Sequence, residues 1–493
     1  MNPYIYLSIV IAYFFVLLIL SQIVNTKRQN HTFYNGDKKS PWFIVAFGMI
    51  GTTISGVTFI SVPGEVGTSS FHYFQFVMGN IVGYIIIATL LIPFYYKKKV
   101  ISIYSILEEK IGTEGHLATS GLFIISKIIG ASFRLFLASL VIHIAISEPL
   151  GIPFSISVLF CLLLIWLYTF RTGIKTIIWS DTIQTVVLIV AAISTIILII
   201  QQTEIPPLSI FTKIKESGSI RIFDFNWLST NNFFKQFISG IFITIALNGF
   251  DQDIIQKNLT CRNSQLARKN MLWFSAFFGI TVFVFLILGA LLYYYAEIKG
   301  IELPTKTDQL YPMLALNHLS SFVAIMFILG ISAAAFSSAD SAITSLTVAF
   351  CVDFLKLPEK ERKNNNSIRT LIHLVFSIII FFVIMLFYKM NNESVVVAIF
   401  KAAGYTYGPI LGVFLFSFFI KRKPHKYFII PSLIASPFLT YFISRIVYTS
   451  FNNYKFGFEL IIINAVITIL LLFIFSSPTP KLKLLNHENT KFP

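Results

Sequence analysis

One short segment in the last third of the chain has the residue types that bind a hard cation. It reads Ala333-Ala334-Ala335-Phe336-Ser337-Ser338-Ala339-Asp340-Ser341 and lies inside a long apolar stretch. Each residue of an α-helix turns about 100° from the one before it, so Ala334, Ser337, Ser338 and Ser341 share one face, with Asp340 beside it. Carbonyl, hydroxyl and carboxylate oxygens on one face suit Na⁺ better than a soft metal.

The composition places this helix in a lipid bilayer. The chain has 493 residues, of which 56% are hydrophobic and 12% are charged, whereas soluble proteins contain about 25% charged residues. The net charge is +16, but the basic residues fall in short loops between apolar segments, so we do not expect nucleic acid as a partner. The three cysteines are far apart in the sequence, which argues against a disulfide framework or a zinc site.

Apolar segments long enough to cross a bilayer recur along the whole chain. They predict an all-α polytopic membrane protein with about 13 transmembrane helices, at 4–24, 42–64, 73–96, 120–147, 152–170, 176–201, 234–256, 271–297, 320–354, 369–389, 394–420, 426–447 and 457–476. The first segment is longer than the apolar part of a signal peptide, which spans about 7–15 residues, so we expect it to be a retained span.

The distribution of Lys and Arg predicts the orientation. With the N-terminus outside, about 26 basic residues lie in inner loops and about 9 in outer loops, as the positive-inside rule requires. We therefore expect a multi-pass protein of the cell (inner or plasma) membrane with its C-terminus in the cytoplasm. The longest outer loop, residues 202–233, is expected to form an extracellular cap.

Two segments carry signs of an interrupted helix. In the second, Gly51 and Gly56 bracket four residues in mid-membrane, where glycine weakens a helix and nearby hydroxyls can satisfy freed backbone groups. The seventh segment carries Gly240 and Asn248-Gly249. Two interrupted helices at corresponding positions of two halves indicate an inverted-repeat transporter. Close packing of helices through small residues is the alternative explanation of the first pattern.

Five motifs, in this order, resemble those of the sodium:solute symporter family, which includes sodium–glucose, proline and sialic acid transporters. They are Ile54-Ser55-Gly56 with Pro63-Gly64, Gly173 to Gln184 (Gly-x-x-x-x-x-Trp-Ser-Asp-x-x-Gln), Asp251 to Lys257 (similar to Asp-Gln-x-x-x-Gln-Arg), Ser337-Ser338-Ala339-Asp340-Ser341, and Gly408 to Phe414 (Gly-Pro-x-x-Gly-x-Phe). The sialic acid branch is the most similar in motif.

The resemblance implies a LeuT-type fold with two inverted five-helix repeats, alternating access and coupling to Na⁺. It divides the chain into an extra N-terminal helix with an inner loop (1–41), a ten-helix core (42–420), and two C-terminal helices with a cytoplasmic tail (421–493). Within the core, the repeats would occupy 42–201 and 234–420, on either side of the outer loop 202–233.

The resemblance also implies a main sodium site between the second and ninth segments. Its ligands would be the carbonyl oxygens of Gly51, Ile54 and Ala334 and the hydroxyls of Ser337 and Ser338. A site without a carboxylate binds weakly, which suits an ion that must be released. The alternative is that these small residues only pack the helices together, with the serine hydroxyls bonded to their own backbone.

An additional ion site is implied around Asp181, with Ser337, Asp340 and Ser341 as its other members. The sialic acid transporters carry serine at the position of Asp340. Since adjacent carboxylates repel each other, this site could hold either Na⁺ or a proton. The alternative is a structural ion pair between Asp181 and Lys175 or Lys127.

Arg134 is the main candidate for substrate binding. A charge in mid-span faces the protein interior or a cavity, and arginine can fork onto a carboxylate. The resemblance places Arg134 where sialic acid transporters hold the carboxylate of their substrate. Further substrate-binding candidates are Ser55, Thr58, Asn80, Thr244 and Asn248. The alternative for Arg134 is an ion pair with an internal carboxylate.

The sequence therefore predicts a sodium-coupled secondary active symporter that imports a small polar organic solute bearing a carboxylate. Its partners would be the solute, sodium ions and the lipid bilayer, and we expect a monomer or a weak oligomer. A proton-coupled symporter that uses Asp181 and Asp340, or a solute-sensing transceptor, is the alternative. The sequence contains no nucleophile–base pair and no phosphate-binding loop, so we do not expect an enzyme.

Overall fold

The computed structural model describes residues 2–25, 38, 40–99, 102–169, 174–203, 206–216, 218–357, 363–390, 395–451 and 454–478. Gly173 and the predicted C-terminal tail from residue 479 lie outside them, as does the side chain of Lys175. The α-helices are α1 (Pro3–Asn25), α3 (Trp42–Thr53), α4 (Gly56–Ser69), α5 (Tyr73–Ile86), α6 (Ile92–Lys98), α7 (Ser105–Ile142), α8 (Phe154–Thr169), α9 (Ile174–Thr203), α10 (Pro207–Glu216), α11 (Phe233–Thr244), α12 (Gln252–Leu259), α13 (Ser264–Lys299), α14 (Leu310–Met313), α15 (Ser321–Ala349), α16 (Lys363–Met390), α17 (Val395–Phe419), α18 (Lys426–Ser450) and α19 (Leu460–Ile474).

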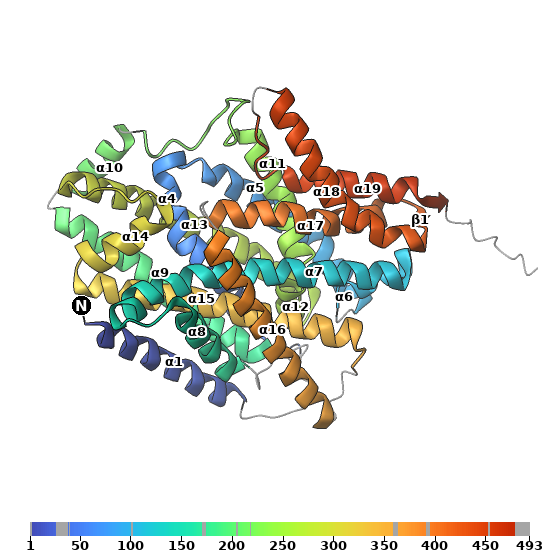
Figure 1. Cartoon of the computed structure of the whole chain (residues 1–493), viewed down its shortest axis with the longest axis horizontal. Helices are drawn as coiled ribbons and strands as arrows, with labels where there is room; N and C mark the ends of the chain where they lie inside the picture. Colours follow the sequence, from blue (N-terminus) through green and yellow to red (C-terminus); the bar gives the residue numbers. More distant parts are fainter. Residues whose placement is uncertain are drawn as a thin grey trace, which may run out of the picture.

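Short helical segments of other types and one small sheet complete the described structure. The π-helical and 3-10 segments are η2 (Ile87–Leu91), η3 (His143–Ser147), η4 (Glu148–Leu150), η5 (Ile245–Gly249), η6 (Thr307–Gln309), η7 (Leu314–His318) and η8 (Phe350–Phe354). Strands β1 (Arg422–Pro424) and β2 (Ser476–Pro478) pair antiparallel. In Figure 1, α1 lies at one edge of the bundle, and α18 and α19 lie at the opposite side.

The described helices confirm an all-α, multi-pass architecture. Nine of them are long and apolar enough to cross a membrane, and the number rises to 11 if each of two bent pairs forms one span. The shorter apolar helices α8 and α19 lie where the fifth and thirteenth spans were predicted. The exact number of spans and the division into repeats stay predictions.

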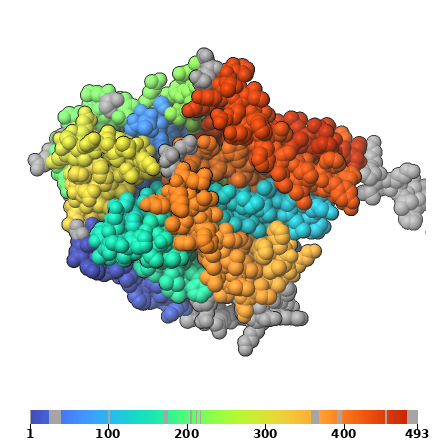
Figure 2. Space-filling model, viewed as in Figure 1, coloured from blue at the N-terminus to red at the C-terminus, as the bar shows by residue number. Residues whose placement is uncertain are grey.

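Helices α16 and α18 present apolar side chains at the surface of the bundle. Phe382 of α16 is 65% exposed and Ile446 of α18 is 61% exposed. The space-filling view shows α16 (orange) across the front of the molecule and α18 (red) at its upper right (Figure 2). Large apolar side chains at the outside of a helical bundle are typical of contact with lipid.

Helix α7 begins earlier than the sequence predicts. The fourth span was expected at 120–147, whereas α7 begins at Ser105 and runs to Ile142. Charged residues, including Glu108, Glu109 and Glu114, lie in its first turns, so a search for apolar segments cannot detect this part of the helix. At Gly112, with a φ of 80°, a kink joins a short first helix to the longer second helix of α7, and glycine adopts this conformation at little cost.

The two predicted interruptions are confirmed. Helices α3 and α4 meet at an angle of 60° across Ile54 and Ser55, and η5 and α12 meet at 65° across Phe250 and Asp251. At the first break the Ser55 N–H donates to the Thr53 carbonyl at 3.1 Å, so it does not make the helical bond to the carbonyl of Gly51. The break therefore presents backbone oxygens to its surroundings, which is tolerated in a membrane only inside protein or a wet cavity.

Helix α15 is the central helix of the bundle. Every residue from Gly330 to Ala349 is buried, and the helix packs against α3, α7 and α9. Because the whole circumference of this stretch is covered by protein, the polar side chains of 337–341 face other helices. Asp340 is therefore buried inside the protein, as expected of a charged residue within a membrane helix.

Helices α5 and α11 pack closely through glycines, which leads to a first prediction. A Cβ added at Gly79 would lie 2.0 Å from the Phe237 carbonyl oxygen, and one at Gly240 would lie 2.3 Å from the Phe76 carbonyl oxygen. Since backbone atoms cannot move aside cheaply, Gly79→Ala should force the helices apart and destabilise the protein by about 1–3 kcal/mol. Thermal unfolding of the detergent-purified protein would measure this loss.

Gly121→Ala is the matched control, because it is also a helical glycine. Its added Cβ would lie 3.8 Å from Phe354, an ordinary contact, so the helix propensity of alanine should keep stability unchanged or raise it slightly. Equal melting temperatures for the Gly79→Ala and wild-type proteins would show that α5 and α11 do not depend on this close approach.

Candidate functional site

A cavity forms where the two broken helices approach each other in the bundle. It is lined by residues of the α3–α4 break, α5, α7, α11 with η5, the start of α12, and α17. All of the residues predicted to bind substrate line it: Ser55, Thr58, Asn80, Arg134, Thr244 and Asn248. The structure therefore brings the predicted set together, and solute binding by these residues stays a prediction.

Arg134 of α7 is a half-buried cation on the wall of this cavity. It makes no hydrogen bond or salt bridge with any residue in the described part of the chain, so the predicted alternative of a paired arginine finds no support there. The amide of nearby Asn80 hydrogen-bonds to α11. With its amide nitrogen turned toward α11, it donates to the Gly240 carbonyl at 3.0 Å and to Thr244 Oγ1 at 3.1 Å.

A buried ion cluster borders the same cavity. The Lys127 ammonium of α7 lies 3.0 Å from both carboxylate oxygens of Asp251 and 3.1 Å from Asp253 Oδ2. The hydroxyl of Tyr407 on α17 donates to Asp251 Oδ2 at 2.9 Å. Lys127 therefore pairs with the start of α12 and does not pair with Asp181, as one predicted alternative had it.

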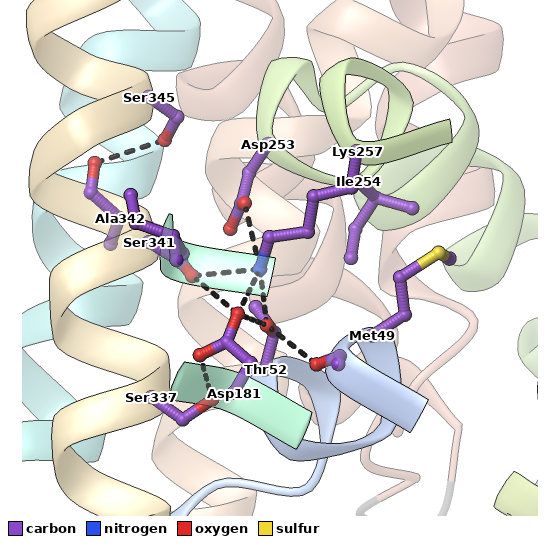
Figure 3. Close-up of polar contacts among 12 residues, drawn as sticks. Met49, Thr52, Asp181, Asp253, Ile254, Lys257, Ser337, Ser341, Ala342 and Ser345 are labelled. Atoms are coloured by element: carbon purple, nitrogen blue, oxygen red, sulfur yellow. Dashed lines mark hydrogen bonds and ion pairs between the residues drawn. The ribbon is translucent and has the colours of Figure 1, made fainter. Parts of the chain in front are cut away.

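Asp181 of α9 is fully buried in an ion pair with Lys257 of α12. Lys257 Nζ lies 2.8 Å from Asp181 Oδ2, while Ser337 donates to Asp181 Oδ1 at 2.6 Å. Thr52 and Ser341 donate to Asp181 Oδ2 at 3.0 Å and 3.3 Å. Figure 3 shows these side chains from four helices pointing toward one another. The predicted ion pair of Asp181 exists, but its partner is Lys257.

Asp340 does not hydrogen-bond to this group, although the sequence led us to expect it there. Its Oδ2 accepts a hydrogen bond from the Tyr168 hydroxyl of α8 at 2.7 Å. The helical turn explains the difference, because Asp340 flanks the face that carries Ser337 and Ser341 and so is directed toward a different neighbouring helix. Of the predicted additional site, the structure gathers Asp181, Ser337 and Ser341.

The predicted main sodium ligands lie where the α3–α4 break meets α15. A Cβ added at Gly51 would lie 3.1 Å from Ser337 Oγ and 2.9 Å from the Asp181 carbonyl oxygen, so only glycine allows this approach. The Ser338 hydroxyl donates to the Ala335 carbonyl of its own helix at 3.2 Å, which leaves its lone pairs available. Ile54 and Ala334 are buried. Carbonyl and hydroxyl oxygens at this junction fit the chemistry of Na⁺.

Sequence reasoning missed Lys257, Asp253 and Tyr407 as members of the ion cluster. A usable signal was present, because Asp251, Asp253 and Lys257 fall within seven residues at the end of the seventh apolar segment. Charges so close to a membrane helix need partners inside the protein. The spacing could not reveal which carboxylate each lysine meets.

Comparisons with known proteins identify the family of the chain. A profile described as the sodium:solute symporter family matches residues 33–426. The sodium/sialic acid symporter NanT of Aliivibrio fischeri is 27% identical over 79% of this chain and 78% of its own length. The sodium/sialic acid symporter SiaT of Proteus mirabilis is 23% identical over 82% of this chain and 83% of its own length. Sodium-coupled monocarboxylate transporter 2 of Bos taurus is 24% identical over 79% of this chain and 63% of its own length.

Solved structures show the same fold. A substrate-bound, outward-open Na⁺-coupled sialic acid symporter superimposes with a TM-score of 0.81 at 20% identity, over 95% of this chain and 97% of that chain. The nucleobase-cation-symport-1 family transporter Mhp1 superimposes with a TM-score of 0.52 at 14% identity, over 90% of this chain and 93% of that chain. These likenesses confirm the predicted LeuT-type architecture. The chain belongs to the sodium:solute symporter family and is a multi-pass, sodium-coupled transporter, not an enzyme.

Proposed function

We propose that this protein imports a small polar solute that bears a carboxylate, driven by Na⁺ moving down its gradient. The solute would bind in the cavity between the two broken helices. Na⁺ would bind beside it, at the junction of the α3–α4 break and α15. Alternating access would expose the two sites to each side of the membrane in turn.

The observation that carries the proposal is the guanidinium of Arg134. It lines the cavity without a hydrogen bond or salt bridge to a carboxylate in the described structure, while the other predicted lining residues offer hydroxyls and amides. A charged side chain within a membrane bundle is costly unless it has a partner. A carboxylate on the solute would supply that partner and bind in the bidentate manner that arginine favours.

The relatives of this chain point to the same chemistry. Two are symporters of sialic acid and one is a transporter of monocarboxylates, and all of these solutes carry a carboxylate. The carboxylate is the feature they share, whereas their size and remaining groups differ. Specificity beyond the carboxylate would depend on the few other side chains that line the cavity.

The proposed sodium ligands are the carbonyls of Gly51, Ile54 and Ala334 with the hydroxyls of Ser337 and Ser338. The break after Thr53 frees backbone oxygens on α3, and α15 supplies the hydroxyls from a buried face. In this site Na⁺ would hold α3 and α15 together, so its binding would favour the conformations in which the two helices are in contact. We also propose the orientation with the N-terminus outside, on the basis of the positive-inside rule.

Uptake into proteoliposomes tests the proposal directly. Sialic acid and short monocarboxylates should accumulate when Na⁺ is imposed outside, and accumulation should stop when choline replaces Na⁺ at constant pH. Uncharged sugars of similar size should not accumulate. Accumulation that persists in choline and follows an imposed pH gradient would favour proton coupling and contradict the proposal. Solute binding without counterflow would instead indicate a sensor.

Removing one sodium ligand should selectively raise the concentration of Na⁺ that uptake requires. Ser338→Ala deletes a buried hydroxyl at the proposed site, so the Na⁺ concentration for half-maximal uptake should rise about tenfold or more, which corresponds to about 1.4 kcal/mol of lost ion binding. Uptake measured over a range of NaCl concentrations at constant ionic strength gives this value.

Ser345→Ala is the control, because Ser345 is a buried serine of α15 whose hydroxyl donates to Ala342 in the same way, at 2.9 Å. Figure 3 shows it on α15, away from Ser337 and Asp181. Its removal should leave the sodium dependence unchanged. Identical sodium dependence in the Ser338→Ala and wild-type proteins would exclude Ser338 as a ligand.

A further inference from the structure

The ammonium of Lys257 lies in a cage of oxygen atoms. Its side chain is fully buried. Nζ lies 2.8 Å from Asp181 Oδ2, 2.7 Å from Ser341 Oγ and 3.5 Å from Asp253 Oδ1, and it also donates to Thr52 Oγ1. These oxygens come from α9, α15, α12 and α3, and they converge on the nitrogen in Figure 3. Two carboxylate and two hydroxyl oxygens around one point form a cation site.

A sodium ion at the predicted additional site would need the same oxygens. Asp181 and Ser341 are two of its predicted ligands, and both lie within 2.8 Å of the ammonium. Na⁺ bound to these oxygens would stand beside Nζ, and two like charges repel strongly at such a distance in a buried environment. The residues present therefore do not fit a second sodium ion while Lys257 holds this position.

The two other predicted ligands each make a hydrogen bond of their own. Asp340 Oδ2 accepts the hydrogen bond of Tyr168 at 2.7 Å, and the Ser337 hydroxyl donates to Asp181 Oδ1 at 2.6 Å. Lysine is suited to replace an ion, because its ammonium is a compact point charge on a long stem. Asp253 helps to hold the ammonium in place, since it sits one helical turn before Lys257 on α12 and its Oδ1 lies 3.5 Å from Nζ.

We propose that Lys257 is a tethered cation that fills the additional cation site, so that this transporter couples one sodium ion to each solute. The inference rests on the proposed sodium site at Ser338, which would bind the single ion. With a monoanionic solute, one Na⁺ balances the charge of the cargo. The transport step would then move no net charge across the membrane.

Counting bound sodium tests the proposal on the purified protein. Binding of radioactive Na⁺ should saturate at about one ion per polypeptide for the wild type and at about two for Lys257→Met, because methionine keeps an unbranched stem and removes the charge. The melting temperature of Lys257→Met should be low in choline chloride and should rise more steeply with NaCl than that of the wild type, as expected when an additional ion binds only the folded state.

The double variant Lys257→Met/Asp181→Asn is the control. It removes both charges, so it should fold without extra NaCl and bind about one Na⁺ again. Two ions per wild-type polypeptide would overturn the proposal, and that count decides the case even if Lys257→Met fails to fold. One ion in a folded Lys257→Met protein would also overturn it. A wild type that binds no Na⁺ would instead contradict the proposed function.

Discussion

Arg134→Ala should abolish the accumulation of carboxylate solutes while leaving the protein folded. In the structure this guanidinium lines the cavity and forms no salt bridge with a carboxylate among the described residues. Truncating one member of a buried, hydrogen-bonded charge pair costs about 2–5 kcal/mol of binding. Solute affinity should therefore fall by about 100-fold or more, measured as uptake into proteoliposomes and as the solute-induced shift in melting temperature.

Arg134→Lys should retain part of the affinity, because the charge remains but the planar fork that matches a carboxylate is lost. Arg445→Ala is the control, since Arg445 of α18 is an exposed arginine outside the cavity, and its removal should leave uptake unchanged. If Arg134→Ala transports a carboxylate solute with wild-type affinity, Arg134 is not part of the binding site.

Lys127→Met should strongly destabilise the protein. The substitution leaves Asp251 and Asp253 buried without the ammonium that now bridges them at 3.0 Å and 3.1 Å. Breaking a buried ion pair on one side costs about 3–5 kcal/mol, because an uncompensated charge stays behind. We expect a lower melting temperature in detergent and a smaller yield of monodisperse protein.

Two variants separate this effect from general sensitivity to substitution. Lys98→Met removes a lysine from an exposed pair with Glu109, and such pairs contribute about 0–1 kcal/mol, so stability should change little. Lys127→Met/Asp253→Asn removes one carboxylate together with the lysine and should recover part of the loss. If Lys127→Met melts at the wild-type temperature, the two carboxylates do not depend on Lys127 for charge compensation.

Periodicity and hydropathy are sufficient to predict much of this fold. The spacing of small and polar residues in 333–341 predicted a helix face of oxygen ligands, and that stretch lies on the buried helix α15. Paired glycines predicted the breaks in the second and seventh segments. Both signals are local, because a helix face and a weak point in a helix are determined by residues that are close in sequence.

The partners of the buried charges could not be predicted in the same way. Lys257 pairs with Asp181, which is 76 positions away in the sequence. Lys257 lies on α12, a helix of eight residues that follows a bend of 65°. The direction of that short helix depends on the backbone geometry at Phe250 and Asp251, which the sequence pattern does not specify. For the same reason the hydrogen bond of Asp340 with Tyr168 on α8 could not be predicted.

The buried charges form one continuous series that alternates in sign: Asp251, Lys127, Asp253, Lys257 and Asp181. Its members belong to α7, α9 and α12, so sliding any of these helices alone would strand an uncompensated charge in the hydrophobic interior. A conformational change that moves these helices must then either carry the three helices as one rigid unit or admit water to hydrate the separated groups. Hydrogen–deuterium exchange at α12 would distinguish a concerted movement from hydration of a local gap.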